Sequence, residues 1–165
     1  MQEPRTADIC GIPMFVHTYK RAKLADSLDE VFLATDSEII AQIAEENNIK
    51  TIMTSKTHQN STERIAEACE HINCDIIVNI QGDEPLLYPE HVNKITRPLL
   101  YNDNIQVSIG ITKFTKKNSQ GDIKAVTDLN EDILYCSRND IPSNYSKVDN
   151  LNTWKLVFIV PHRKK

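Results

Sequence analysis

Polar and charged residues follow three short apolar segments of this sequence. The polar segments are Ala34-Thr35-Asp36, the loop from His58 to Arg64, and Gln81-Gly82-Asp83-Glu84-Pro85. Ligands of open α/β sheets bind beyond the carboxyl ends of the strands, because the loops diverge there and the N-termini of helices point toward them. If the apolar segments are strands of one sheet, the three polar segments predict a ligand site at its edge.

Asp83 is the first candidate for chemistry, because it comes shortly after the apolar segment 75–80. A carboxylate at the end of a central strand is well placed to hold Mg²⁺ and, through the metal, the phosphates of a nucleotide. The structural alternative is an Asx turn, in which the Asp83 side chain stabilises the chain reversal before Pro85. The residues alone favour the two interpretations equally.

Arg64 lies in the first turn of a predicted helix, where a cation opposes the helix dipole. Its position therefore indicates an anionic partner. The simpler alternative is an exposed ion pair with Glu63 or Glu67. His58, in the preceding loop, is a candidate general base, although a histidine in a polar loop is usually only solvated.

Two further basic residues, Lys124 and Arg138, lie on or beside a predicted hairpin. Its strands, 123–126 and 133–136, flank a polar turn. Each of the two basic residues alone is explained as a surface charge. Together they would flank a cleft for an acidic ligand.

The elements that must position these residues alternate between strand and helix through the first two thirds of the chain. This order favours an α/β fold with a mostly parallel sheet and helices on its faces. A polar connection, 139–153, precedes an apolar run that predicts one more strand. The expected strands are, in chain order, 31–34, 50–53, 75–80, 105–111, 123–126, 133–136 and 156–160.

Prolines and small polar residues mark the expected helix starts. Ile39, Ile40 and Ile43 are expected to face the core from the second helix. Pro98 is expected to kink or shorten the fourth. The starts are, in chain order, Pro13, Asp36 or Ser37, Ser61 or Thr62, and Pro89.

The composition is that of a single globular domain, which we expect to span residues 1–165. The chain is 40% hydrophobic and 25% charged, and its net charge of −4 lacks the basic excess of nucleic-acid-binding proteins. No apolar run approaches the roughly 20 residues that cross a bilayer, and the N-terminus is unlike a signal peptide, so we expect a cytoplasmic protein without membrane insertion. The four cysteines form no CxxC pair. We expect them to be reduced thiols and not a disulfide frame or zinc site.

Several motifs follow one another in an order shared with a known enzyme family. Val78–Pro85, VNIQGDEP, is the most specific, and His58–Ala66, HQNSTERIA, matches a stretch that the family writes HxSGTxR. The remaining segments are Ala7–Ala22 (ADICGIPMFVHTYKRA), Phe32–Asp36 (FLATD), Lys124, Leu134–Arg138 (LYCSR) and Ile141-Pro142. Together they resemble the 3-deoxy-manno-octulosonate (KDO) cytidylyltransferases, also called CMP-KDO synthetases, over nearly the whole chain.

The resemblance implies a Rossmann-like nucleotidyltransferase fold, a three-layer α/β/α arrangement with a mostly parallel sheet. It implies an enzyme that joins CTP to the acidic sugar KDO, with Mg²⁺, giving CMP-KDO and pyrophosphate for lipopolysaccharide or capsule synthesis. The full-length family is expected to form homodimers. Catalysis of such a transfer comes mainly from positioning and charge neutralisation.

The resemblance also implies roles for individual residues. Asp83 would be the catalytic metal carboxylate. Gln81, Arg138 and Arg64 would contact the substrate, and Ser61 and Thr62 would contribute to the nucleotide site.

The chain departs from the family pattern at several points. It begins with Gln2–Thr6 inside a motif where the family has a strand and a triphosphate-gripping loop with glycine and lysine. Ser61 replaces a family glycine, and Ile12 replaces a family lysine. A later family segment, with a second metal-binding aspartate and much of the dimer contact, has no counterpart. We therefore expect an N- and C-terminally incomplete domain with little or no turnover.

Two other functions are compatible with the same residues. One is a cytidylyltransferase for another sugar acid, such as sialic acid. The other is a non-catalytic binding domain with the same fold, which the missing loop and Ser61 favour.

Overall fold

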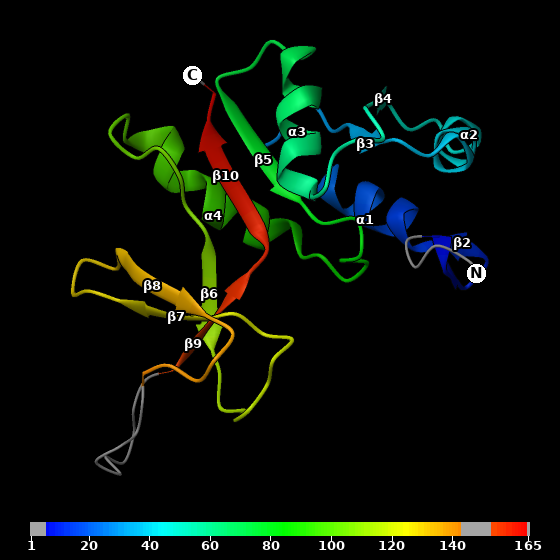
Figure 1. The fold of residues 1–165 in the computed structure, drawn as a ribbon. Coiled ribbons are helices and arrows are strands. Elements are labelled where there is room, and N and C mark those ends of the chain that lie inside the picture. Colours follow the sequence, from blue (N-terminus) through cyan, green and yellow to red (C-terminus); the bar gives the residue numbers. More distant parts are fainter. Residues whose placement is uncertain (1–5, 143–152, 165) are drawn as a thin grey trace. The chain divides into compact units, whose positions relative to one another are not determined.

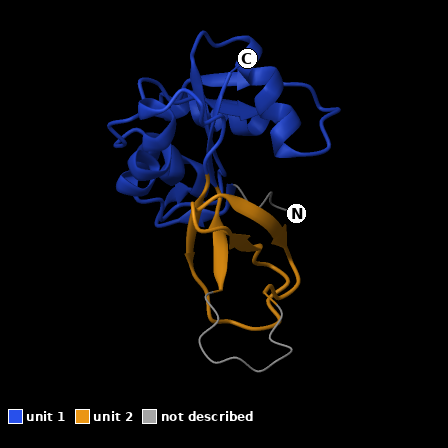
Figure 2. Cartoon of the chain, turned by 90° about the vertical axis from the view of Figure 1, so that its left-hand side faces the viewer, with its two compact units in different colours: residues 1–108, 159–165 blue, residues 109–158 orange. Residues whose placement is uncertain are grey.

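The structure is a computed structural model that describes residues 6–142 and 153–164. The chain forms two compact units, residues 1–108 with 159–165 and residues 109–158 (Figure 2). The expectation of one domain stays a prediction.

The elements of the described residues are β1 (Asp8–Ile9), β2 (Ile12–Pro13), α1 (Met14–Ala22), β3 (Leu33–Thr35), α2 (Glu38–Glu46), β4 (Thr51–Met53), α3 (Ser61–Glu70), β5 (Ile76–Ile80), α4 (Pro89–Tyr101), β6 (Gly110–Lys113), β7 (Lys124–Thr127), β8 (Ile133–Ser137), β9 (Trp154–Val157) and β10 (Ile159–Arg163) (Figure 1).

The strands of the first unit form separate hydrogen-bonded pairs. β3 pairs with β4 in parallel, β5 pairs with β10 in antiparallel, and β1 and β2 form a short antiparallel pair. The structure therefore has the expected mixture of helices and strands, but most strand pairs of the described residues are antiparallel. A run of apolar residues predicts a buried strand without showing the direction of its neighbour.

The predicted strand 156–160 is wrong as one element. It is divided at Phe158 between β9, in the second unit, and β10, in the first. The predicted strand 105–111 is divided in a similar way, into a bridge from Val107 to His162 and strand β6. Continuous apolar runs hide such breaks, because both halves satisfy the same burial pattern.

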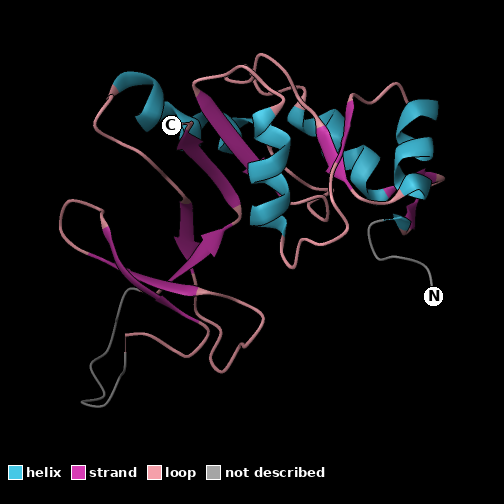
Figure 3. Cartoon of the chain, turned by 45° about the horizontal axis from the view of Figure 1, so that its top comes forward, coloured by secondary structure: helices cyan, strands magenta, loops and turns pink. Residues whose placement is uncertain are grey.

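The helices of the described residues, drawn in cyan in Figure 3, lie between residues 14 and 101 and so all belong to the first unit. The apolar face of α1, with Phe15 and Val16, packs against Ile40 and Ala44 of α2. Ile43 is partly buried against this cluster, but Ile39 is 69% exposed, so its predicted place in the core is wrong. Consecutive helical residues are about 100° apart, and the inward face of α2 is centred on Ile40 and Ala44.

The helix starts agree with the sequence at α2 and α4. Pro13, expected in the first turn of a helix, instead ends β2 and directly precedes α1. Ser37 caps α2, since its side chain accepts a hydrogen bond from the Ile40 N–H. Asn60, and not Ser61 or Thr62, caps α3. α4 begins at Pro89 as predicted and continues through Pro98 to Tyr101, so Pro98 does not end it. None of the described helices has the length and apolar character needed to cross a membrane.

The second unit is built on a four-stranded antiparallel sheet in the order β6-β9-β7-β8. The predicted hairpin is confirmed as β7 and β8, with an irregularity between Val126 and Thr127. The predicted polar connection 139–153 lies largely outside the described residues, which omit 143–152.

Candidate functional site

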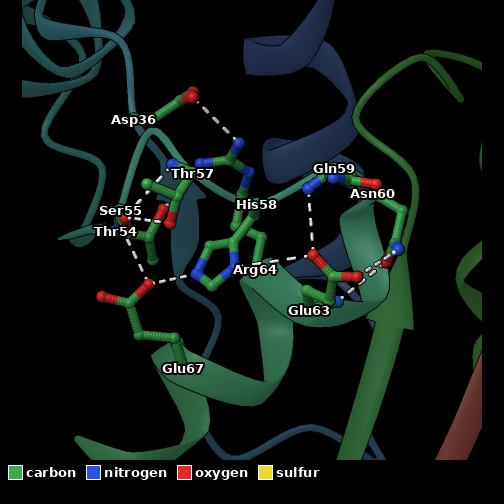
Figure 4. Close-up of polar contacts among 10 residues, drawn as sticks. All are labelled: Asp36, Thr54, Ser55, Thr57, His58, Gln59, Asn60, Glu63, Arg64 and Glu67. Carbon is green, nitrogen blue, oxygen red and sulfur yellow. Dashed lines mark hydrogen bonds and ion pairs between the residues drawn. The ribbon is translucent and has the colours of Figure 1, made fainter.

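The loop that precedes α3 is fastened to the first turn of that helix. The Asn60 carbonyl oxygen Oδ1 accepts the Glu63 N–H at 3.0 Å, and the Glu63 carboxylate accepts the Gln59 N–H at 2.9 Å and the Asn60 amide at 2.8 Å (Figure 4). A side chain that accepts from the third residue of a helix satisfies one of its free N–H groups. These contacts hold the polar loop in one conformation beside the helix N-terminus.

Arg64 reaches from α3 to the residues that follow β3 and β4. Its Nη2 lies 3.0 Å from Asp36 Oδ2, and its Nη1 donates to Thr54 Oγ1 at 2.7 Å (Figure 4). The side chain is only 14% exposed. Its alternative pairing with Glu63 or Glu67 is wrong, because the anionic partner observed is Asp36.

His58 contacts a carboxylate. Its Nε2 forms a hydrogen bond with Glu67 Oε2, and its Nδ1 lies 3.8 Å from Glu63 Oε2. Glu67 also accepts the Ser55 N–H at 2.9 Å. The Ser55 hydrogen bond first, and the His58 contact second, lower the pKa of the Glu67 carboxyl below its ordinary value. The interpretation of His58 as only solvated is therefore wrong.

The end of β5 also meets the first turn of α3. Gln81 Nε2 lies 3.4 Å from Ser61 Oγ and donates a long hydrogen bond to it. Thr62, the next residue, is exposed, and the structure shows no hydrogen bond of its side chain to any described residue. Gln81, Ser61 and Arg64 thus meet around one helix end, while Thr62 faces outward.

Asp83 lies exposed in the turn after β5. The turn is closed by a backbone hydrogen bond from Glu84 N–H to the Gln81 carbonyl at 3.3 Å. Among the described residues, the Asp83 carboxylate accepts no hydrogen bond and forms no ion pair. The Asx-turn alternative is therefore wrong in this structure, because the side chain takes no part in holding the turn.

A cavity of 570 Å³ lies between β3 and β5, and α3 forms part of its wall. Ser61, Arg64 and Gln81 line it, whereas Thr62 and Asp83 do not. Asp83 follows the lining residue Gly82 directly. The described residues contain no group of three or more His, Cys, Asp or Glu side chains arranged to hold a metal ion.

The two basic candidates of the second unit differ in their surroundings. Lys124 is fully buried, and its Nζ donates to the carbonyl oxygens of Ser119 at 2.6 Å, Asp122 at 3.2 Å and Arg138. Its interpretation as a surface charge is wrong, because the ammonium holds together the loops around β7. The Arg138 guanidinium is bound to the Gln120 carbonyl at 2.9 Å and lies near the surface.

Comparison with known proteins identifies the family. The model of the Cytidylyltransferase family matches residues 6–164. The chain belongs to the cytidylyltransferase family. Curated relatives include the 3-deoxy-manno-octulosonate cytidylyltransferases of Geobacter metallireducens, 38% identical over 88% of this chain, and of Nitratiruptor sp., 37% identical over 87%. The chain spans 58% and 63% of the lengths of these two cytidylyltransferases.

Solved structures of cytidylyltransferases share the fold. A CMP:2-keto-3-deoxy-manno-octonic acid synthetase complexed with CTP is 29% identical, with a TM-score of 0.92 over 97% of this chain and 67% of that one. The 4-diphosphocytidyl-2C-methyl-D-erythritol synthase of Anaerococcus prevotii is 14% identical, with a TM-score of 0.62 over 96% of this chain and 65% of that one, and supports the fold alone. The nucleotidyltransferase fold predicted from the motifs is confirmed.

Sequence reasoning missed the partners of the site residues. Asp36 was expected in a polar segment at the predicted ligand edge and as a possible helix cap, and Glu67 as a possible ion-pair partner of Arg64. Helical spacing places Arg64 and Glu67 one turn apart. It does not show that both contact the segment between β4 and α3, or that Arg64 also reaches Asp36 after β3. The sequence signal that could have brought them together is that Asp36 and the loop before Arg64 belong to polar segments predicted at the same edge of the sheet.

Proposed function

We propose that this chain carries part of a KDO cytidylyltransferase, which transfers CMP from CTP to the acidic sugar 3-deoxy-manno-octulosonate. The observation that carries the proposal is the TM-score of 0.92, over 97% of the chain, with a synthetase complexed with CTP. The curated relatives with this name support the same substrate. The products are CMP-KDO and pyrophosphate.

The reaction is a single displacement at phosphorus. The anomeric hydroxyl oxygen of the sugar forms a bond to the α-phosphorus of CTP, the bond from that phosphorus to the α,β-bridging oxygen breaks, and the hydroxyl proton is released. Pyrophosphate leaves with the bridging oxygen. The protein contributes alignment of the two reactants and neutralisation of charge, because no covalent intermediate is needed.

The residues around the N-terminus of α3 and the carboxyl end of β5 are proposed to hold the reactants. Ser61 and Thr62 lie in the first turn of α3, where free N–H groups attract phosphate. Gln81 would contact the sugar acid beside them. The substrate role of Arg138, in the second unit, stays a prediction from the resemblance. Arg64, already paired with Asp36, is proposed to act on the substrate while it holds the loop after β3.

Asp83 fits the requirements of a magnesium ligand. Its carboxylate is exposed and accepts no hydrogen bond from the described residues, so both oxygens are available. Magnesium is commonly held by one or two carboxylates, substrate phosphates and water, so a single aspartate is a sufficient protein ligand. The metal would neutralise charge on the triphosphate when bound.

The test measures pyrophosphate release from CTP and Mg²⁺ with a panel of sugar acids that includes KDO and sialic acid. Release with KDO, above release with sialic acid, supports the proposal, and preference for sialic acid contradicts it. Calorimetry with CTP and Mg²⁺ is the second arm. Binding of CTP without release from any sugar acid would instead identify a non-catalytic binding domain.

A further inference from the structure

The segment 81–88 joins β5 to α4 and carries Asp83. Backbone hydrogen bonds close it, from the Glu84 N–H to the Gln81 carbonyl at 3.3 Å and from the Leu87 N–H to the Glu84 carbonyl at 3.0 Å. The Asp83 side chain is exposed and forms no hydrogen bond or ion pair with the described residues. The position of its carboxylate is therefore determined by the backbone on either side of it.

Helix α1 holds this backbone directly before Asp83, through Thr18. The Thr18 hydroxyl Oγ1 donates to the Gly82 carbonyl at 3.1 Å, and Thr18 is only 4% exposed. The same hydroxyl lies 3.4 Å from the Met14 carbonyl of its own helix, so the contact that leaves the helix is the shorter one. Gly82 also packs on α1, since a Cβ placed on it would lie 3.9 Å from the Cβ of Phe15.

Arg21 of the same helix holds the other end of the segment. Its Nε donates to the Leu87 carbonyl, and its guanidinium carbon lies 5.5 Å from the centre of the Tyr88 ring. Thr18 and Arg21 are three residues apart, so they lie on the same face of α1. This face is therefore bonded to the segment on both sides of Asp83.

The helix that makes these contacts is itself fixed in the core of the first unit. Phe15 and Val16 are buried and pack against Ile40 and Ala44 of α2. A metal ligand is effective only when supporting residues hold it close to its productive geometry. A segment bonded at both ends to a packed helix also has less conformational freedom to lose when its carboxylate binds a cation.

We propose that Thr18 and Arg21 are positioning residues for the magnesium site, which fix the segment 81–88 so that the Asp83 carboxylate is held ready for the metal. The inference rests on the proposed function, in which Asp83 is the magnesium ligand, and adds two residues that contact neither the metal nor the nucleotide. Thr18 is bonded to the residue next to Asp83, whereas Arg21 is bonded four residues beyond it. Thr18 is therefore expected to have the larger effect.

The test measures the magnesium-dependent gain in CTP affinity, which is the Kd without Mg²⁺ divided by the Kd with Mg²⁺, by calorimetry. Thr18→Val keeps the shape of the side chain and removes the hydroxyl. It should reduce the gain by about tenfold, at the low end of the losses typical of residues that support a metal ligand, and leave the Kd without Mg²⁺ unchanged. Thr18→Ser keeps the hydroxyl and removes a buried methyl group, so it should preserve the gain although the chain becomes less stable.

Amide hydrogen exchange tests the contacts without any ligand. Arg21→Met keeps the aliphatic part of the side chain and removes the donor, so exchange at Glu84 and Leu87 should become several-fold faster as the segment is released from α1. Thr18→Val should have the same effect at Glu84. The matched control is Lys20→Met, at an exposed position of the same helix, which should change neither the exchange nor the gain.

The outcomes separate this inference from the proposed function. Loss of the gain in Asp83→Asn but not in Thr18→Val would overturn the inference and leave the proposed function intact. Equal loss in Thr18→Val and Thr18→Ser would also overturn it, because the loss would then follow stability and not the hydroxyl. So would unchanged exchange at Glu84 and Leu87 in both Thr18→Val and Arg21→Met. An unmodified chain without a gain, or an unchanged gain in Asp83→Asn, would overturn the metal role of Asp83 and this inference with it.

Discussion

Arg64 forms an ion pair with Asp36, with 3.0 Å between Nη2 and Oδ2, and this contact joins the first turn of α3 to the residue that follows β3. The same guanidinium donates to Thr54 after β4 at 2.7 Å. A cation in the first turn of a helix is unfavourable by itself. The carboxylate of Asp36 offsets this cost and fixes the polar loops on which the candidate site depends.

The ion pair of Arg64 and Asp36 is expected to be worth more than a surface pair. A double-mutant cycle with Asp36→Asn and Arg64→Gln should give a coupling free energy of roughly 1 kcal/mol, since both side chains are partly shielded. The measurement is chemical unfolding of the four proteins. The matched control is Lys56 with Glu38, 74% and 86% exposed at 3.9 Å, for which we expect coupling near zero. Equal coupling in both cycles would contradict the structure.

Glu67 is expected to make the chain sensitive to acid. The Ser55 N–H first, and His58 second, lower the pKa of the Glu67 carboxyl from its ordinary value of 4.5. The ionised carboxylate therefore stabilises the fold fully above pH 4.5, and this contribution is lost as the pH falls through the pKa of the folded state. Glu67→Gln should therefore lower the free energy of unfolding at about pH 6 and have less effect at about pH 3. Urea unfolding across this range measures the difference. The exposed Glu70→Gln on the same helix is the control, and an equal pH profile for both variants would refute the assignment.

Asn60, and not the serine or threonine after it, is expected to determine the stability of the start of α3. Asn60→Ala should cost about 1 kcal/mol, because the Glu63 N–H loses its acceptor. Thr62→Ala should change the free energy of unfolding by less than about half of that, since its exposed side chain caps nothing. Thermal unfolding of the two variants checks the order. A larger loss for Thr62→Ala would restore the cap expected from the sequence.

Lys124 is expected to be a structural residue of the second unit. Lys124→Met should destabilise the chain by about 2–4 kcal/mol, because the carbonyl oxygens of Ser119, Asp122 and Arg138 lose their common donor in a buried place. Lys117→Met, at an exposed position of the same unit, serves as the control and should leave stability nearly unchanged. Amide exchange resolved by residue would show the loss around β7. An unaltered exchange pattern there would exclude the structural role.

Asp83 is expected to affect ligand binding without affecting folding. Its exposed carboxylate forms no hydrogen bond or ion pair with the described residues, so Asp83→Asn should leave the unfolding midpoint unchanged and reduce magnesium-dependent CTP binding by about tenfold or more. Calorimetry with CTP, with and without Mg²⁺, measures the effect. Glu84→Gln beside it is the control. If Asp83→Asn bound CTP and Mg²⁺ as tightly as the unmodified chain, the proposed metal role would be wrong.

Local patterns in the sequence predicted the elements that carry the site. Pro89 begins α4 as predicted, and the predicted strand 75–80 is observed as β5, which begins one residue later, at Ile76. The hairpin around β7 and β8 also followed from a polar turn between two apolar segments. These features depend on residues close together in the chain, where side-chain periodicity and the restricted backbone of proline act directly.

The order of the motifs also predicted the family, because many positions along the chain match the family pattern in the same sequence order. By contrast, the residues of the candidate site could be predicted, but not the contacts between them. Gln81 and Ser61 were both chosen from the sequence, yet their contact across 20 positions is visible only in the folded chain.

The sequence by itself determined where the helices and most of the strands form and which family the chain belongs to. Only the tertiary structure decided that Arg64 turns to Asp36, that Lys124 is buried, and that residues 156–160 divide between two sheets. The physical reason is that pairing and burial depend on groups brought together from distant parts of the chain. A charged side chain satisfies the same local pattern whether its partner is water, a neighbour on the helix or a carboxylate on another strand.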